Sequence, residues 1–204
     1  MTDEVFEDQK FSDEDWYGED LTGRTYRGCS FRDVDLTDST SRGATFESCE
    51  LSNCRFNASS HAGTAFVACD VRRTSFFGAT LDGCKLDGCK LDGTVFVECT
   101  LRPMTVTGGR WHGVTIRGAK LSGLVLDGVS LAEADLADSD LTGSSLNGCD
   151  LSRVTLRGTD LSGVDLRGAR LDGTDLHLAR LSGTRLDLAG AVHLAEMHGA
   201  VVEA

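Results

Sequence analysis

The stretch LDGCKLDGCKLDG, residues 81–93, repeats one five-residue pattern almost three times. It places Cys84 and Cys89 five residues apart. Cysteines at a short regular spacing often bind a metal ion or form a disulfide. Whether these two do so depends on where the repeat directs their side chains, and the same question decides the fold.

The five-residue step of this stretch continues through most of the chain without a slip. From Phe6 to Leu186, every fifth residue is apolar or aromatic except Ser41 and His61, and from Leu121 onward every one is leucine. A period of five does not match the 3.6 residues of an α-helical turn, so the pattern excludes a helix. A repeat this regular indicates a solenoid.

The residue two positions before each apolar one is usually small, and all eight cysteines occur there: Cys29, Cys49, Cys54, Cys69, Cys84, Cys89, Cys99 and Cys149. In extended backbone, residues two apart point to the same face, so both positions face inward. Glycine is common two residues after the apolar position, where a turn needs a permissive backbone. The pattern therefore predicts a β-helix of stacked coils, about 4.8 Å apart.

ADLADSDLTGSSLNGCDL (134–151) and TDLSGVDLRGARLDGTDL (159–176) resemble the consensus of the pentapeptide-repeat family, A(D/N)LxG. The resemblance implies an all-β fold, a right-handed quadrilateral β-helix with four pentapeptides per coil. A period of twenty also fits the positions of residues with special side chains. Ser41 and His61 are twenty apart and would be neighbours, and one ladder would contain Cys29, Cys49, Cys69 and Cys89.

Inward-facing thiols are interpreted as small core residues rather than as ligands or crosslinks. Zinc needs ligands that converge tetrahedrally, whereas a ladder presents parallel side chains. Stacked Cβ atoms about 4.8 Å apart are also too distant for usual disulfide geometry. We expect the side chains of His61 and Ser41 to hydrogen-bond to each other inside the rod. A core filled with Leu and Phe leaves no pocket, so we expect no catalytic residue, metal, cofactor or small-molecule substrate, and no enzyme activity.

The charge of the chain is negative and concentrated at its start. Nine acidic residues against Lys10 within residues 1–20 contribute −8 of the formal −12. An acidic chain is a poor candidate for nucleic-acid binding. No apolar run has the roughly 18 residues of a membrane span, and the acidic start resembles no targeting signal, which predicts a cytoplasmic protein without membrane contact.

Three regions are expected along the chain. Residues 1–22 are predicted to be an acidic, partly disordered arm, because their small-residue positions hold Glu4, Gln9, Glu14 and Glu19. Residues 23–187 form the β-helix, with a change of packing near 103–109.

Residues 188–204 form a C-terminal helix and tail, with the helix over about 189–198 and a stop at Gly199. This end is expected to cap the rod and dimerise two copies. The dimerisation residues are Leu188, Val192, Ala195, Val201 and Val202.

Three stretches are similar to the gyrase-targeting group of the family, which contains MfpA and the Qnr proteins: TFESCELSNCRFNASSHAGTAFVAC (45–69), GTVFVECTLRPMTV (93–106) and LDLAGAVHLAEMHGA (186–200). Pro103 and the core histidine His61 resemble irregularities of MfpA, and the absence of loops favours that loopless type. The resemblance implies a rod-shaped dimer with the width and negative surface of B-DNA. Such a rod would bind DNA gyrase in place of DNA and protect it from quinolones or other topoisomerase poisons.

Charge alone does not distinguish DNA mimicry from a merely soluble surface. About nine coils give a rod of roughly 43 Å, a length over which duplex DNA carries on the order of 25 charges, against −4 for the chain after residue 20. No basic residue occurs between Lys120 and Arg153. The carboxylates there, all expected to be exposed and here called the acidic belt, are Asp127, Glu133, Asp135, Asp138, Asp140 and Asp150. The alternative function is a structural or scaffolding protein with an unrelated protein partner.

Overall fold

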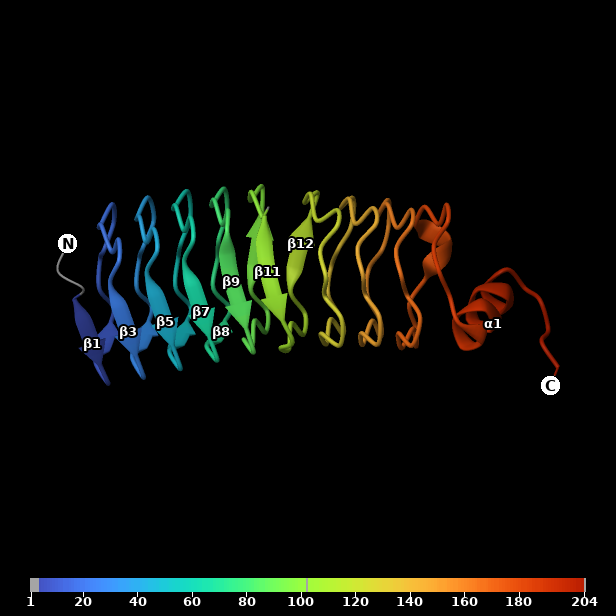
Figure 1. Cartoon of the computed structure of the whole chain (residues 1–204), viewed down its shortest axis with the longest axis horizontal. Helices are drawn as coiled ribbons and strands as arrows, with labels where there is room; N and C mark the ends of the chain where they lie inside the picture. The colour runs from blue at the N-terminus through green and yellow to red at the C-terminus, as the bar shows by residue number, and fades with distance from the viewer. Residues whose placement is uncertain (1–3, 102, 204) are drawn as a thin grey trace.

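The computed structural model describes residues 4–101 and 103–203, which form a rod of stacked coils with a helix at its C-terminal end (Figure 1). A six-stranded sheet contains β1 (Val5–Glu7), β3 (Thr25–Arg27), β5 (Thr45–Glu47), β7 (Ala65–Val67), β9 (Cys84–Asp87) and β11 (Met104–Thr107). A four-stranded sheet contains β2 (Lys10–Ser12), β4 (Ser30–Arg32), β6 (Glu50–Ser52) and β8 (Asp70–Arg72). The third sheet pairs β10 (Val95–Val97) with β12 (Thr115–Arg117).

The register of these sheets follows the twenty-residue period. Every strand pair and single bridge of the described residues is parallel and joins residues twenty apart, from Val5 opposite Thr25 to Asp165 opposite Arg185. Four columns of such pairs run along the rod, one for each pentapeptide of a coil. The predicted four-sided β-helix is therefore confirmed.

The core consists of the inward-facing positions that the repeat predicts. In the N-terminal half, Tyr26, Phe46 and Phe66 form a column of parallel rings with centroids 5.0 Å apart. This distance equals the usual spacing between coils, so each ring contacts the next without distorting the wall. In the C-terminal half the core consists of leucines such as Leu141 and Leu161, whose exposed fraction is at most 1%.

The first coil differs from the prediction of a partly disordered arm. Strands β1 and β2 lie within residues 5–12 and pair in register with β3 and β4, so the regular coils begin before residue 22. Sequence reasoning rejected these residues because it placed Glu4 and Glu14 inside the rod. In the described residues Glu4 is exposed and Glu14 is only half-buried, so both carboxylates reach solvent. Glu4 pairs with Arg24 at 3.1 Å, and Glu14 accepts a hydrogen bond from the Trp16 indole at 2.8 Å.

The wall changes in the middle of the rod. Strands end with β12, and beyond it the described coils are joined by single bridges. The expectation of a rod without any pocket is wrong beside Pro103. Among the described residues no bridge joins Thr100 to Lys120, although Thr80 bridges Thr100 and Lys120 bridges Asp140. Pro103 also has no N–H group for the bond to the next coil that this repeat position donates elsewhere, as Gly63 does to the Asp82 carbonyl at 2.8 Å.

The resulting opening has a volume of 640 Å³ and is lined by Glu98, Cys99, Thr100, Leu101, Pro103, Gly118 and Lys120. A few residues later, Gly109 has a φ of +111°, and a Cβ atom at this position would lie 2.4 Å from the Cys89 carbonyl oxygen. Only glycine fits such a close approach between coils. The expected change near residues 103–109 is thus a local break in the wall.

The C-terminal end is covered by a short 3-10 turn, η1 (Leu176–Leu178), and by α1 (Leu188–Met197). The helix lies within one residue of the predicted bounds, and Gly199 follows it with a φ of +81°. Asp187 caps the helix by accepting from the Gly190 amide at 2.9 Å and also accepts from the Gly168 amide of the preceding coil at 2.7 Å. In the described ranges, no helix has the length and apolarity that a membrane span needs.

Candidate functional site

The inward cysteines are free thiols with carbonyl partners. Cys49, Cys69 and Cys89 donate to backbone carbonyls of the preceding coil at 3.2–3.3 Å. Burial raises the pKa of Cys54 to about 11 and that of Cys149 to about 12, which leaves these groups protonated and unreactive at neutral pH. The ladder itself is buried and its thiols contact backbone carbonyls, so it serves packing.

Ser41 and His61 meet inside the rod, as their twenty-residue spacing predicts. The Ser41 hydroxyl lies 2.6 Å from His61 Nδ1, and the Ser59 hydroxyl lies 2.6 Å from Nε2. Because Ser59 donates its proton to the Phe56 carbonyl, it accepts from Nε2–H, and Nδ1 accepts from Ser41. Complete burial lowers the pKa of His61 to about 3, so the ring is neutral. It has no access to a substrate.

The structure distributes the acidic belt around the whole rod. Asp127 lies on the side of the Tyr26 column, and Glu133 and Asp150 lie on the next side. Asp135 and Asp138 occupy the third side, and the fourth contains Asp140. A partner approaching from one direction therefore meets only some of these carboxylates.

The belt is also less exposed than the sequence predicts. Asp127, Glu133 and Asp138 are exposed, but the prediction that all six are exposed is wrong for Asp135, Asp140 and Asp150, which are half-buried. These three precede the inward leucines and form bridges in the wall. Their carboxylates turn along the surface and accept from the backbone amides two residues later, as Asp135 does from Ala137 at 3.1 Å.

Arginines from adjacent coils pair with the belt. Arg117 contacts Asp135 at 2.5 Å, and Arg157 lies 3.7 Å from Asp138. Further pairs are Arg153 with Glu133 and Arg170 with Asp150. The gap in basic residues along the sequence does not persist in space, since stacking places residues twenty apart side by side. Asp127 instead accepts from Ser145 and from the Asn147 amide at 2.5 and 3.0 Å.

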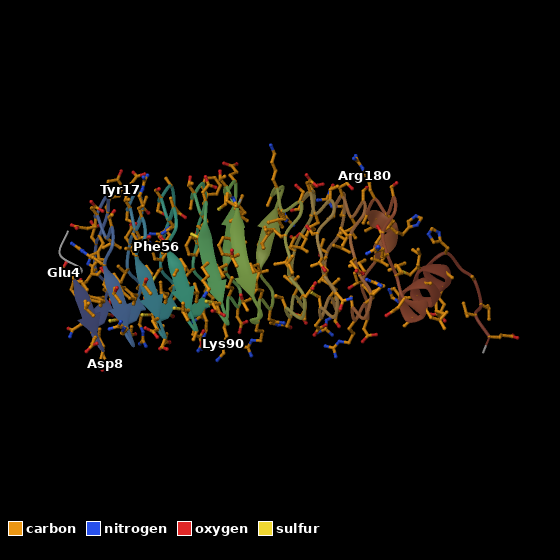
Figure 2. The ribbon with its side chains drawn as sticks, in the orientation of Figure 1. Glu4, Asp8, Tyr17, Phe56, Lys90 and Arg180 are labelled. Atoms are coloured by element: carbon orange, nitrogen blue, oxygen red, sulfur yellow. The ribbon has the colours of Figure 1, made fainter. Side chains whose placement is uncertain are left out.

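The N-terminal coils carry a second acidic surface, part of which sequence reasoning assigned to the partly disordered arm. Five carboxylates and Arg55 surround a hollow of 310 Å³: Asp13, Glu14, Asp15, Asp33 and Asp35. A hydrogen bond from Arg55 lowers the pKa of Asp35 to about 2. Figure 2 shows other polar side chains at this end, including the labelled Glu4, Asp8 and Tyr17. The twenty-residue spacing could have revealed this clustering.

The predicted dimerisation residues fall into two groups. Leu188, Val201 and Val202 are 81%, 86% and 44% exposed, whereas Val192 and Ala195 are half-buried. The helix packs on the rod through Leu194 and Met197, which sequence reasoning missed. The sequence pattern of the helix alone does not indicate which of its apolar residues pack on the rod and which are exposed to solvent.

Comparisons with known proteins agree with this architecture. The family description "Pentapeptide repeats" matches residues 62–102, 112–148 and 149–187 with eight copies. No curated protein sequence matches the chain.

Among solved structures, trypsin-treated R167E QnrB1, a plasmid-mediated fluoroquinolone resistance protein, is 19% identical with a TM-score of 0.77, covering 98% of this chain and 100% of its own. Full-length QnrB1 is 20% identical with a TM-score of 0.71, covering 96% and 100%. These likenesses show a shared fold.

Proposed function

This chain belongs to the pentapeptide-repeat family, and from that premise we propose that it binds DNA gyrase, a type II topoisomerase, in place of duplex DNA. Binding would modulate or inhibit the enzyme and protect it from quinolones or other topoisomerase poisons. The observation that carries the proposal is the likeness to QnrB1 along the whole rod, because QnrB1 is a fluoroquinolone resistance protein. We also propose that, within the gyrase-targeting group, the chain is of the loopless MfpA type.

Shape and surface chemistry support the proposal. A protein that replaces DNA must offer anionic groups along a stiff rod and needs no pocket of its own. The parallel register fixes the carboxylates of successive coils in columns, and the buried core keeps the rod stiff. A cationic DNA-binding surface would be attracted to such columns.

The arginines on the belt do not prevent such binding. The Arg153–Glu133 pair is open to water, with side chains 67% and 43% exposed. Exposed ion pairs of this kind are worth about 0–1 kcal/mol, so a cationic partner can displace Arg153 at little cost. Our proposed contact is the third side of the rod, with Asp135 and Asp138, together with Glu133 at the turn that precedes this side.

We also propose that the active form is a homodimer joined through its C-terminal ends. Leu188 and Val201 present exposed apolar side chains beyond the last coil. A twofold axis there would bury this surface and give one rod twice as long. Light scattering after gel filtration tests the dimer, and Leu188→Asp with Val201→Asp should give a monomer.

The alternative is a scaffolding pentapeptide-repeat protein with an unrelated protein partner. The neutralisation of the belt by Arg117, Arg153, Arg157 and Arg170 favours it, since a mixed-charge surface lacks the uniform potential of DNA. In that case the protein would change neither the activity of gyrase nor its response to a fluoroquinolone.

A supercoiling assay with purified gyrase separates the two functions. The protein should inhibit supercoiling, or reduce cleavage-complex formation in the presence of a fluoroquinolone. Absence of both effects over a wide range of ratios of protein to enzyme contradicts the gyrase proposal and leaves the scaffold.

The belt is tested by the double substitution Glu133→Lys and Asp138→Lys, which avoids the half-buried Asp135 and Asp140. Its matched control is Glu7→Lys with Glu47→Lys, two exposed carboxylates that both pair with Arg27 far from the belt. The belt variant should lose most of its effect on gyrase while the control retains it. Equal loss in both variants would show that overall charge, rather than this side of the rod, matters.

A further inference from the structure

Two exposed histidines meet at the C-terminal end of the rod. His177 belongs to η1 and His198 follows α1, so they are separated by 21 residues and brought together only by the docking of the helix. His177 Nδ1 lies 3.4 Å from His198 Nε2, and the ring planes cross at 69° with centroids 4.7 Å apart. Neither ring has a role in the core or in the proposed gyrase contact.

The separation of the two nitrogens is informative. It is long for a hydrogen bond from an N–H group, which is usually about 2.7–3.2 Å. It fits a shared metal ion better. Two nitrogens that each bind Zn²⁺ at about 2.05 Å with a tetrahedral angle lie about 3.4 Å apart. Both rings are exposed, so a small rotation lets the two lone pairs converge on one ion.

Within residues 4–101 and 103–203, one chain brings only these two ligands together. Among the described residues no group of three or more His, Cys, Asp or Glu side chains could hold a metal ion. Structural zinc sites in proteins are almost always closed by four protein ligands. The missing two must come from outside the chain.

A second copy can provide them. The histidine pair lies beside Leu178, which is 48% exposed, and at the same end of the rod as the exposed Leu188 and Val201. In a twofold dimer the residues near the axis meet the same residues of the partner, so a pair of histidines meets a pair.

We propose that His177 and His198 form half of a tetrahedral Zn²⁺ site, completed by the same two residues of a second copy. The ion ties the C-terminal helix to the last coil in each subunit and joins the subunits. The ligand class is a divalent transition ion that prefers imidazole, for which Zn²⁺ is the probe. This inference rests on the homodimer of the proposed function.

Metal titration of the full-length, chelator-treated protein tests the site. Zn²⁺ should bind at one ion per two chains and strengthen the dimer in sedimentation equilibrium. Co²⁺ should give the intense visible absorption of a tetrahedral site. His177→Gln and His198→Gln should each weaken metal binding by about tenfold or more, since even the loss of outer-shell partners costs 10–100-fold.

His112→Gln is the matched control, because His112 is also exposed but lies 3.5 Å from Glu133 in the middle of the rod. It should bind Zn²⁺ as the unsubstituted protein does. One ion per single chain, no binding, or equal affinity in all three variants would overturn the inference.

The gyrase assay separates this inference from the proposed function. If the chelator-treated protein dimerises and acts on gyrase but binds no Zn²⁺, only the metal site fails. If Zn²⁺ joins two chains but gyrase is unaffected, the gyrase function fails and the site stands.

Discussion

The two halves of the rod share one period but differ in filling and in wall. Aromatic rings such as Tyr26, Phe46 and Phe66 stack at 5.0 Å in the N-terminal half, where two of the four sides form short strands and the other two are joined by single bridges. Leucines such as Leu141 and Leu161 fill the C-terminal half, where single bridges suffice. The comparison teaches that the period fixes the path of the chain in both halves, whereas the core filling and the strand content of the walls change along it.

The largest expected effect comes from removing a stacked ring. Phe46→Ala should destabilise the protein by about 3–5 kcal/mol, because it opens a cavity between Tyr26 and Phe66 and breaks two ring contacts. Leu146→Ala, at the same position of the repeat in the other half, should cost about 1 kcal/mol less, since ring pairs add about 0.5–1.5 kcal/mol beyond burial. Denaturant unfolding measures both. Equal losses would break the distinction between the halves.

The buried polar pair gives a smaller effect. Ser41→Ala should cost about 1–3 kcal/mol, because His61 Nδ1 loses its donor in a dry core. Replacing both Ser41 and His61 by leucine, the residue at Leu21 and Leu81 of the same column, should bring stability back to within about 1 kcal/mol of the original. A double variant less stable than Ser41→Ala would show that the pair fixes the local packing.

A pH dependence should arise in the N-terminal half from His61. Its pKa in the folded protein is about 3, below the unfolded value of about 6.5, so the unfolded chain binds a proton that the folded chain excludes. This stability is complete above about pH 6.5 and falls by about 1.4 kcal/mol per pH unit below it. Thermal unfolding between pH 7 and 5 measures the slope. The variant with leucine at both positions should lose this slope, and an unchanged slope would assign it to other groups.

The smallest effect is expected at surface ion pairs, where the halves should behave alike. Arg55 pairs with Asp35, and Arg170 pairs with Asp150, each arginine twenty residues after its carboxylate along the chain. Arg55→Ala and Arg170→Ala should each cost about 0.2–1 kcal/mol, and less at high salt. Urea unfolding at two salt concentrations measures both. A cost well above 1 kcal/mol in one half would show that its wall depends on ion pairing.

Much of the fold could be predicted because the repeat is local and strict. Burial of alternate residues and a turn every five residues predict the inward positions, and the four-pentapeptide coil implied by the family resemblance places Ser41 beside His61. The end of the repeat and Gly199 predict the C-terminal helix to within one residue. The first coil was mispredicted because Glu4 and Glu14 look like buried charges until their place at an open end is known.

The candidate site was less predictable. The belt appeared as a run of unpaired carboxylates because residues twenty apart, such as Arg153 and Glu133, are distant in sequence and adjacent in space. The opening beside Pro103 depends on which pairing between neighbouring coils is missing there, and the repeat does not specify this. The pairing of His177 with His198 depends on how the helix docks.

The sequence by itself determined the five-residue period and the inward residues, because alternation and turn chemistry act between neighbours along the chain, and its resemblance to the family supplied the coil length that identifies the ladders. Only the tertiary structure decided which charges are neutralised, where the wall opens and which end residues meet. These depend on contacts between coils and at the ends of the rod, and a repeat that looks the same at every coil cannot specify them.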